Sequence, residues 1–265
     1  MEQGSASIGE FSIVRQHRRM LANMNNYLTK ESRILDFGCG AGEAVYQYRD
    51  AGFDAYGFDV RPAVVCRMPQ DERFFRFATT GKPVNVPEYV VDQSTFKIPF
   101  EDQAFDFVFS TSTLEHVQDH ELAFAESARV LRSGGVAIHT FPARYVPIEP
   151  HMHVPLGSVV QNYYWFLFWA IMGIRNEFQK HMSAVDCARI NLHYSRTGLK
   201  YLKIRELRGL ALKYFSKAEL IPHLWEFGDG GGLSKWGVLM LIPLVDRYFR
   251  WLYGHCHTVV LFLQR

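Results

Sequence analysis

The sequence predicts an α/β fold with a doubly wound, mostly parallel sheet, and two observations support it. Short apolar runs bounded by turn residues recur through the first half of the chain, as strands do: "RILDF", "DAYGF", "EYVVD", "FDFVFS" and "VAIHTF". Helix-like stretches separate several of them, and apolar strands joined by helices form parallel sheets covered on both faces. The handedness of such crossovers then gives a Rossmann-like core that extends to about residue 141.

The remaining elements follow from local signals. A helix is expected at about 11–28, and a clearer one in "DHELAFAESARVLRSGG", where two glycines supply a stop. Its helical spacing is carried by Leu122, Ala125, Ala128 (or Arg129) and Leu131, and the stop by Gly134 and Gly135. "SKAELIPHLWEFG" predicts a helix with Ser216 as N-cap and Glu219 as its capping-box partner. "HTVVLFLQR" predicts a closing strand.

Three parts of the chain are expected. Residues 1–141 hold an N-terminal helix and the Rossmann-like core. Residues 142–214 form a largely helical insertion after the fifth strand, a lid over the acceptor site, because proline, histidine and aromatic residues become frequent there. Residues 215–265 return to the core with helices and the closing strand.

Composition excludes several classes of protein. A net charge of +2 is too small to indicate a nucleic-acid partner. The four cysteines form no CxxC pair, so neither a disulfide framework nor a zinc knuckle is expected, and a reducing, cytoplasmic location is the simplest interpretation. No secretory signal is visible at the N-terminus. The most apolar run, 163–174, is shorter than the roughly 20 residues of a membrane-spanning helix.

The glycine-rich stretch "GCGAG" follows the first strand and precedes a helix, which is where parallel sheets bind ligands. Its glycines, Gly38, Gly40 and Gly42, have the spacing G-x-G-x-G and not the G-x-G-x-x-G of dinucleotide enzymes. Asp36 lies inside the preceding strand. Asp59 ends the next strand, where such folds present a carboxylate to ribose hydroxyls.

Four stretches together resemble the successive motifs of class I S-adenosylmethionine-dependent methyltransferases. Within that class they are most similar to the methyltransferase-11-like small-molecule group. They read "ILDFGCGAGE", "YGFDV", "IPFEDQAFDFVFSTSTLEHV" and "RVLRSGGVAIHTFP". The resemblance covers about 30–142 and the segment near 216–228. It implies the class I methyltransferase fold, methyltransferase activity and S-adenosyl-L-methionine as cofactor, and it says little about the acceptor.

The resemblance also implies cofactor-binding residues. The three glycines shape the turn under the methionine portion, with Cys39 filling the turn, Asp36 near the amino group and Asp59 on the ribose hydroxyls. Val60 flanks the adenine. The family's usual carboxylate at the adenine amine corresponds to Ser94, and Asp92 stands two residues earlier, so either residue can serve. Ser110 and Thr111 line the methyl-donor site.

The loop "FPARYVPIEPHMHVP" after the fifth strand carries the candidate acceptor residues. A sugar hydroxyl stays protonated at pH 7, so a general base is useful, and His151 or His153 is the candidate, with Glu149 beside them. A structural role for the two histidines is one alternative. A divalent metal held by Glu149, His151 and His153 is another, although E-x-H-x-H is too common a pattern to predict a metal site. Arg144, Tyr145 and His116 are candidate substrate-binding residues, and a positional role is favoured for Glu115 and His116 of "TLEHV".

Two further segments leave alternatives open. The aromatic run "NYYWFLFWAIMGIRN" can be core packing, an apolar wall of the acceptor site, a dimer interface or a peripheral membrane contact. The basic run from Arg196 to Lys217 can be a solvated amphipathic helix or a cradle for a phosphorylated, nucleotide-linked or lipid-linked acceptor.

The sequence therefore predicts a methyltransferase that acts on a hydroxyl of a small molecule, with a carbohydrate or glycoconjugate intermediate as leading class. A polyketide, a lipid or another secondary metabolite is the alternative, methylated on O, N or C. Base-amine methylation is disfavoured because no D/N/S-P-P-Y/F motif stands at "STSTLEHV". Hypotheses of another class are an NAD-dependent oxidoreductase, which the glycine spacing disfavours, and a catalytically silent cofactor-binding partner. A homodimer is left open.

Overall fold

The computed structural model describes residues 12–59, 74–76, 97–221, 251 and 256–265. Within these residues seven strands form one sheet in the order β3-β2-β1-β4-β5-β7-β6. Their bounds are β1 Arg33–Phe37, β2 Asp54–Asp59, β3 Phe74–Arg76, β4 Phe105–Thr111, β5 Leu131–Pro142, β6 Lys217–Leu220 and β7 Thr258–Gln264.

The pairing of these strands confirms the predicted fold class. β1 pairs in parallel with β2 and β4, β2 with β3, and β4 with β5. β7 runs antiparallel to both of its neighbours, β5 and β6. The order reverses between β1 and β4, so the carboxyl ends of these two strands flank the switch point at which doubly wound sheets bind ligands. The closing strand predicted near the C-terminus is β7.

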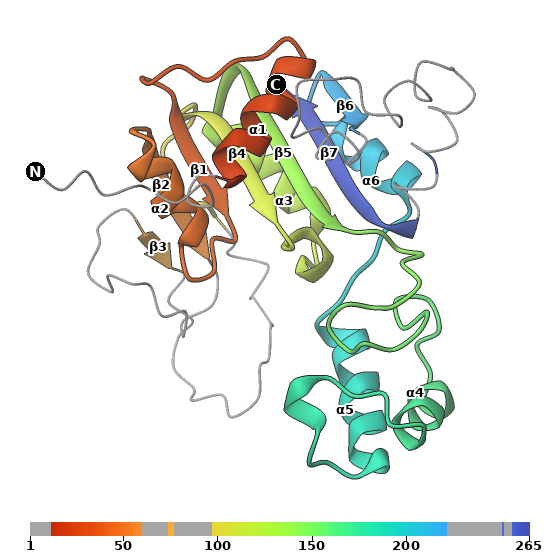
Figure 1. The fold of residues 1–265 in the computed structure, drawn as a ribbon. Helices are drawn as coiled ribbons and strands as arrows, with labels where there is room; N and C mark the ends of the chain where they lie inside the picture. The colour runs from red at the N-terminus through yellow and green to blue at the C-terminus, as the bar shows by residue number, and fades with distance from the viewer. Residues whose placement is uncertain (1–11, 60–73, 77–96, 222–250, 252–255) are drawn as a thin grey trace, which may run out of the picture.

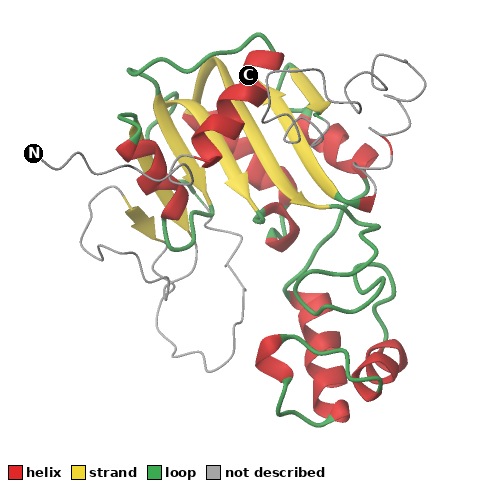
Figure 2. Cartoon of the chain, viewed as in Figure 1, coloured by secondary structure: helices red, strands yellow, loops and turns green. Residues whose placement is uncertain are grey.

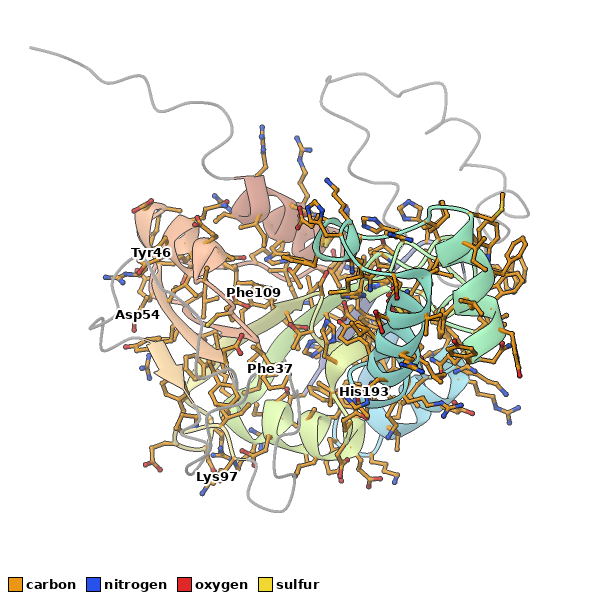
Figure 3. The ribbon with its side chains drawn as sticks, turned by 90° about the horizontal axis from the view of Figure 1, so that it is seen from below. Phe37, Tyr46, Asp54, Lys97, Phe109 and His193 are labelled. Carbon is orange, nitrogen blue, oxygen red and sulfur yellow. The ribbon has the colours of Figure 1, made fainter. Side chains whose placement is uncertain are left out.

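Helices cover both faces of the sheet (Figure 2). Helices α1 (Ser12–Asn23) and α2 (Glu43–Asp50) pack on one face over a cluster that includes Phe107 and Phe109. Helices α3 (His120–Val130) and α6 (Ile204–Ala211) pack on the other, over a cluster that includes Phe37. Phe37 and Phe109 lie inside the layers, whereas Lys97 lies at the outside (Figure 3). Burying large aromatic side chains on both faces is what stabilises this sheet.

The segment that begins at Ser216 corrects one prediction. Lys217–Leu220 is strand β6 and not a helix, and the hydroxyl of Ser216 donates to the carbonyl of Gln264 at 2.9 Å. Its backbone N–H donates to the carbonyl of Gln264 at 2.8 Å, which continues the pairing with β7. Lys, Ala, Glu and Leu favour helices locally, but the edge of β7 offers backbone partners and the side chain of Ala218 becomes buried, so tertiary context overrides propensity. The continuation to 228 lies outside the described residues.

Two other element boundaries differ from the predictions. Helix α3 ends at Val130, before the predicted glycine stop, because Leu131 already pairs with Phe105 of β4. The buried side of α3 includes Ala123 and Phe124, whereas Leu122, which the predicted stripe included, is half-buried.

The third strand also differs in place. β3 is Phe74–Arg76, a stretch for which no strand was predicted. The predicted strand "EYVVD" lies outside the described residues.

The insertion leaves the sheet after β5 and stands beyond the edge at which the parallel strands end (Figure 1). It contains α4 (Tyr163–Ile171), the 3-10 turn η3 (Glu177–Gln179) and α5 (Ala184–Thr197). A small core of its own joins the loop after β5 to these helices: Met152, Val154, Phe166, Ala188, Leu199 and Tyr201. Helix α6, grouped with the insertion by sequence, instead packs its Leu207 and Ala211 into the sheet's core.

The aromatic helix α4 and the basic run have distinct surroundings. In α4, Phe166 and Ala170 are buried, whereas Tyr164, Phe168 and Ile171 are exposed, so core packing accounts for one side only. The basic run divides between the end of α5, an extended link, α6, whose Leu207 and Ala211 are buried, and a turn that leads to the first residue of β6. Its α6 part is therefore an amphipathic helix on the sheet.

Candidate active site

The glycine loop between β1 and α2 is shaped by backbone contacts with β2. The N–H groups of Gly38 and Cys39 donate to the carbonyl of Phe58 at 2.7 and 3.1 Å, and the N–H of Gly40 donates to Asp59 Oδ2 at 2.8 Å. Gly38 has a φ of +84°, and a Cβ there would lie 2.4 Å from the side chain of Thr113. Only glycine fits both conditions.

Asp36 and Asp59 place two buried carboxylic acids at the adjacent ends of β1 and β2. Burial and the negative charge of Asp59 raise the pKa of Asp36 well above its ordinary value. A Cβ on Gly40 would meet no described atom within 4 Å, so the loop faces open space there. The arrangement fits a ligand that brings a positive charge to Asp36 and lies over the glycine loop, as the ammonium group of S-adenosylmethionine would.

The other predicted cofactor residues differ in burial, and three of them lie outside the described residues. Ser110 is fully buried, and its hydroxyl bonds to His139 Nδ1 of β5 at 2.8 Å. Thr111 ends β4 and is exposed. Cys39 is half-buried, with its Sγ 3.9 Å from the carbonyl oxygen of Gly40. Gly42 is the N-cap of α2. Val60, Asp92 and Ser94 lie outside the described residues.

The loop after β4 connects the glycine loop to the insertion. Thr113 Oγ1 donates to the carbonyl of Gly38 at 3.5 Å, and the next residues form the short 3-10 turn η2 (Leu114–His116). The insertion docks on this turn where it returns to the sheet: His116 Nδ1 bonds to the carbonyl of Gly198 at 2.9 Å, and the N–H of Lys200 donates to the carbonyl of Glu115 at 2.7 Å. The cofactor loop and the insertion therefore meet at η2.

Glu149 organises the loop after β5. Its buried carboxylate accepts from the N–H groups of His151 and Met152, at 2.9 and 2.7 Å, from His151 Nδ1 at 2.6 Å and from the hydroxyl of Tyr201 at 2.9 Å. Burial raises the pKa of Glu149, but the hydrogen bond and charge of His151 and the other donors outweigh it, so the pKa lies below its ordinary value. The group is thus a carboxylate that orients the His151 ring.

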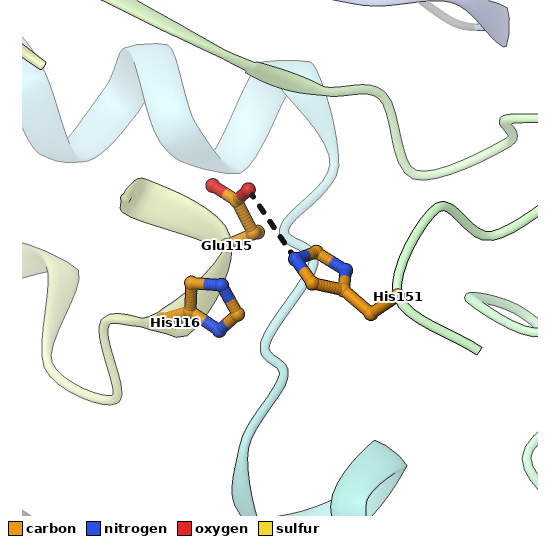
Figure 4. Close-up of side chains that lie close together, drawn as sticks. All are labelled: Glu115, His116 and His151. Carbon is orange, nitrogen blue, oxygen red and sulfur yellow. Dashed lines mark ion pairs between the residues drawn. The ribbon is translucent and has the colours of Figure 1, made fainter. Parts of the chain in front are cut away.

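Three side chains converge at this place (Figure 4). His151 Nε2 lies 4.0 Å from Glu115 Oε1, and the rings of His116 and His151 pack edge to face with centroids 4.7 Å apart. One ligand atom of each of the three residues lies within 4.8 Å of the others. Tyr194 of α5 adds a ring 5.9 Å from that of His151.

The remaining predicted residues do not join this cluster. His153 is exposed with a φ of +60°, and its N–H donates to the carbonyl of Glu149 at 2.8 Å. The stretch from Glu149 to His153 is therefore a turn and not the extended segment that would place both histidines on one side. Arg144 donates to the carbonyl of Tyr201 and lines a small recess beside Glu115, whereas Tyr145 is 40% exposed.

Sequence reasoning did not find Tyr201, which is 52 positions from its partner Glu149. No local pattern marks it. For Glu115 and His116 a positional role was favoured over catalysis, although their place in the loop after a strand was a signal that both face the ligand-binding edge.

Comparison with known proteins agrees with the motifs. Residues 35–139 match the family model described as Methyltransferase domain. A sarcosine/dimethylglycine N-methyltransferase of Halorhodospira halochloris is 29% identical over 229 residues, 82% of this chain and 77% of that protein. A ubiquinone biosynthesis O-methyltransferase of Photorhabdus laumondii is 30% identical over 118 residues, 42% of this chain and 45% of that protein.

Residues 35–139 form a methyltransferase domain of this family. The methyl donor of the domain is S-adenosylmethionine. Among solved structures, phosphoethanolamine N-methyltransferase 2 of Haemonchus contortus, in complex with phosphomonomethylethanolamine and S-adenosylhomocysteine, aligns with 94% of this chain and 52% of its own, with a TM-score of 0.49 and 15% identity. Of the described helices, none combines the length and apolar character that crossing a membrane requires.

Proposed function

We propose that the protein transfers the methyl group of S-adenosylmethionine to a hydroxyl of a small molecule, with a carbohydrate or glycoconjugate intermediate as the leading acceptor class. The observation that carries the proposal is the convergence of Glu115, His116 and His151 on the turn that packs against the glycine loop. The preference for a sugar is supported by the polar residue Arg144, which lines the small recess beside Glu115.

The cofactor residues keep the roles that the motifs assign them. Asp36 faces the ammonium group of the cofactor. The positive charge of that group offsets the burial and the negative charge of Asp59, which together raise the pKa of Asp36. The glycine loop lies under the methionine portion. Asp59 receives the ribose hydroxyls with the carboxylate oxygen that is not bonded to Gly40.

Methyl transfer to a hydroxyl requires that the acceptor oxygen be aligned with the methyl group and that the hydroxyl lose its proton. The acceptor oxygen forms a bond to the methyl carbon while the carbon–sulfur bond breaks, its electron pair remains on sulfur, and the hydroxyl proton must leave. His151, rather than His153, is the candidate that assists, because its Nδ1–H is held by Glu149 and its Nε2 faces the cluster. This nitrogen can accept the proton itself or bind a cation that acidifies the hydroxyl.

The test combines binding and turnover. S-adenosylhomocysteine should raise the melting temperature and NAD should not, whereas stabilisation by NAD alone would refute the methyltransferase assignment. Replacing Asp59 with Ala should abolish the shift. Release of S-adenosylhomocysteine is then measured with a panel of sugars, sugar nucleotides and hydroxylated metabolites, and methylation of none of their hydroxyls would overturn the proposed acceptor class.

N-methylation is the second candidate. The match to the sarcosine/dimethylglycine N-methyltransferase spans 229 residues and therefore extends well beyond the methyltransferase domain of 35–139. Adding glycine, sarcosine and dimethylglycine to the same panel separates the two candidates. Turnover with the amines and not with the hydroxyl compounds would replace the leading assignment.

A further inference from the structure

We propose that Glu115, His116 and His151 bind a divalent transition-metal ion at the mouth of the acceptor site. The consequence for catalysis rests on the proposed function, but the site itself does not. The three residues come from two separate loops, η2 and the turn after β5, which the fold brings together.

The hydrogen bonds of the two rings direct their Nε2 lone pairs to the cluster. His116 Nδ1 contacts the carbonyl oxygen of Gly198, which can only accept, so this nitrogen carries the proton. His151 Nδ1 likewise donates to the carboxylate of Glu149. An ion binds the neutral form of each ring, in which the lone pair is then on Nε2, and Figure 4 shows this nitrogen of each ring turned toward Glu115. Proteins fix metal-binding histidines in this way, through a carbonyl or carboxylate on the far nitrogen.

The spacing is that of a site which has to contract slightly around an ion. The three ligand atoms lie within 4.8 Å of one another. A point midway between them is therefore at most about 2.8 Å from each atom. Metal–nitrogen and metal–oxygen bonds of about 2.1 Å then require each ligand atom to move inward by at most about 0.7 Å. Small side-chain rotations provide such a shift.

Hydrogen bonds set the orientation of two of the three ligands. The ring of His151 is tied to Glu149, whose carboxylate is itself fixed by two backbone N–H groups and the hydroxyl of Tyr201. Glu115 is buried, at 1% exposure, and the backbone of its turn is bonded to Lys200. A positive ion there would interact favourably with the negative charge of this buried carboxylate.

The ligand set indicates the kind of ion. Two imidazoles and one carboxylate suit Zn²⁺, Mn²⁺, Fe²⁺ or Co²⁺, whereas Mg²⁺ and Ca²⁺ prefer oxygen ligands. Three protein ligands leave positions for a substrate oxygen. An acceptor hydroxyl bound there would lose its proton at a lower pH, so His151 would serve as a ligand and not as a base.

The test uses the full chain without a histidine tag, stripped with a chelator and dialysed. Co²⁺ is the probe, because its visible absorption reports the coordination geometry of the bound ion, and Zn²⁺, Mn²⁺ and Mg²⁺ are compared by calorimetry. One Co²⁺ per chain should bind, with Mg²⁺ at least 100-fold weaker. Glu115→Gln and His151→Ala should each lose at least tenfold in affinity, and His153→Ala, an exposed histidine of the same turn, should lose none.

Two further measurements keep the outcome clear. Glu149→Gln should weaken the ion by tenfold to 100-fold through the His151 ring. Every variant must still be stabilised by S-adenosylhomocysteine, which shows that the sheet is folded. Absence of Co²⁺ binding to the wild-type chain, or an equal loss in His153→Ala, would overturn the proposal. A bound ion with no turnover on the hydroxyl panel would support the metal site and refute the proposed function.

Discussion

The cofactor side and the acceptor side of this protein are built in different ways. The cofactor side, 33–59, is made of one strand, one loop, one helix and a second strand, and the backbone of the loop makes most of its contacts. The acceptor side is made of side chains that are far apart in the chain: His116 bonds across 82 positions to Gly198, and Tyr201 across 52 to Glu149. A site formed by backbone groups needs glycines at particular positions. A site formed by side chains needs a buried residue that binds several of them, as Glu149 does here.

The largest effect is expected from Gly38→Ala on the cofactor side. Its Cβ would overlap the side chain of Thr113 at 2.4 Å, and its φ of +84° adds strain. We expect a loss of about 3 kcal/mol in the free energy of unfolding and more than 100-fold in affinity for S-adenosylhomocysteine. Urea denaturation and calorimetry measure the two quantities.

Gly134→Ala is the matched control for this change. Gly134 also has a positive φ, of +75°, but a Cβ there meets no described atom within 4 Å. The substitution should cost only about 1 kcal/mol and leave cofactor affinity unchanged. Equal losses in the two variants would show that strain alone, and not contact with Thr113, makes Gly38 necessary.

The next effect separates the two sides. Glu149→Gln leaves one acceptor oxygen where a carboxylate accepted four hydrogen bonds, so we expect a loss of about 2 to 3 kcal/mol in local stability. Hydrogen exchange should accelerate in 149–201 and stay unchanged in β1 and β4, and turnover should fall with cofactor affinity unchanged. Tyr201→Phe, which removes one donor, should cost about 1 kcal/mol. Exchange that accelerates equally in the sheet would contradict the separation.

This contrast also explains what could be predicted from the sequence. The strands around the glycine loop and the closing strand were predicted, because their apolar pattern, their glycines and Asp59 are close together in the chain. The same local reasoning failed for Lys217–Leu220, whose strand conformation depends on the edge of β7. It could not choose between His151 and His153, because the difference arises from the buried carboxylate of Glu149, and one of its partners, Tyr201, is 52 positions away.

A smaller effect is expected from Asp36→Asn. Burial and Asp59 raise the pKa of Asp36, so the ionised form destabilises the folded protein at pH values above that raised pKa, and the penalty disappears as the pH falls toward about 4. The variant should therefore be more stable than the wild type at pH 8, by about 1 kcal/mol, and equally stable at pH 4. Its affinity for S-adenosylhomocysteine should fall about tenfold. A variant that is less stable at pH 8 would contradict the buried-charge argument.

The smallest effect at neutral pH concerns His17 on α1. It distinguishes the cofactor side from the acceptor side by the pH at which each begins to lose stability. Its Nδ1 bonds to the hydroxyl of Tyr48 at 2.8 Å, and burial lowers its pKa to about 3. The unfolded state binds a proton below about pH 6.5 and the folded state does not, so stability falls as the pH drops from there toward 3. Glu149, with its lowered pKa, stabilises the protein above about pH 4.5 and fails only below it.

The double variant His17→Phe with Tyr48→Phe tests this order, because it removes both partners of the bond and leaves no buried polar group behind. Between pH 7.5 and 5.0 it should lose about 2 kcal/mol less stability than the wild type, measured by urea denaturation. Tyr201→Phe, which leaves the carboxylate of Glu149 and the ring of His151 in place, should show the same loss as the wild type over that interval. If the double variant matched the wild type instead, the acid sensitivity between these pH values would have to come from His120 or His139, whose pKa values burial lowers to about 4 and about 3.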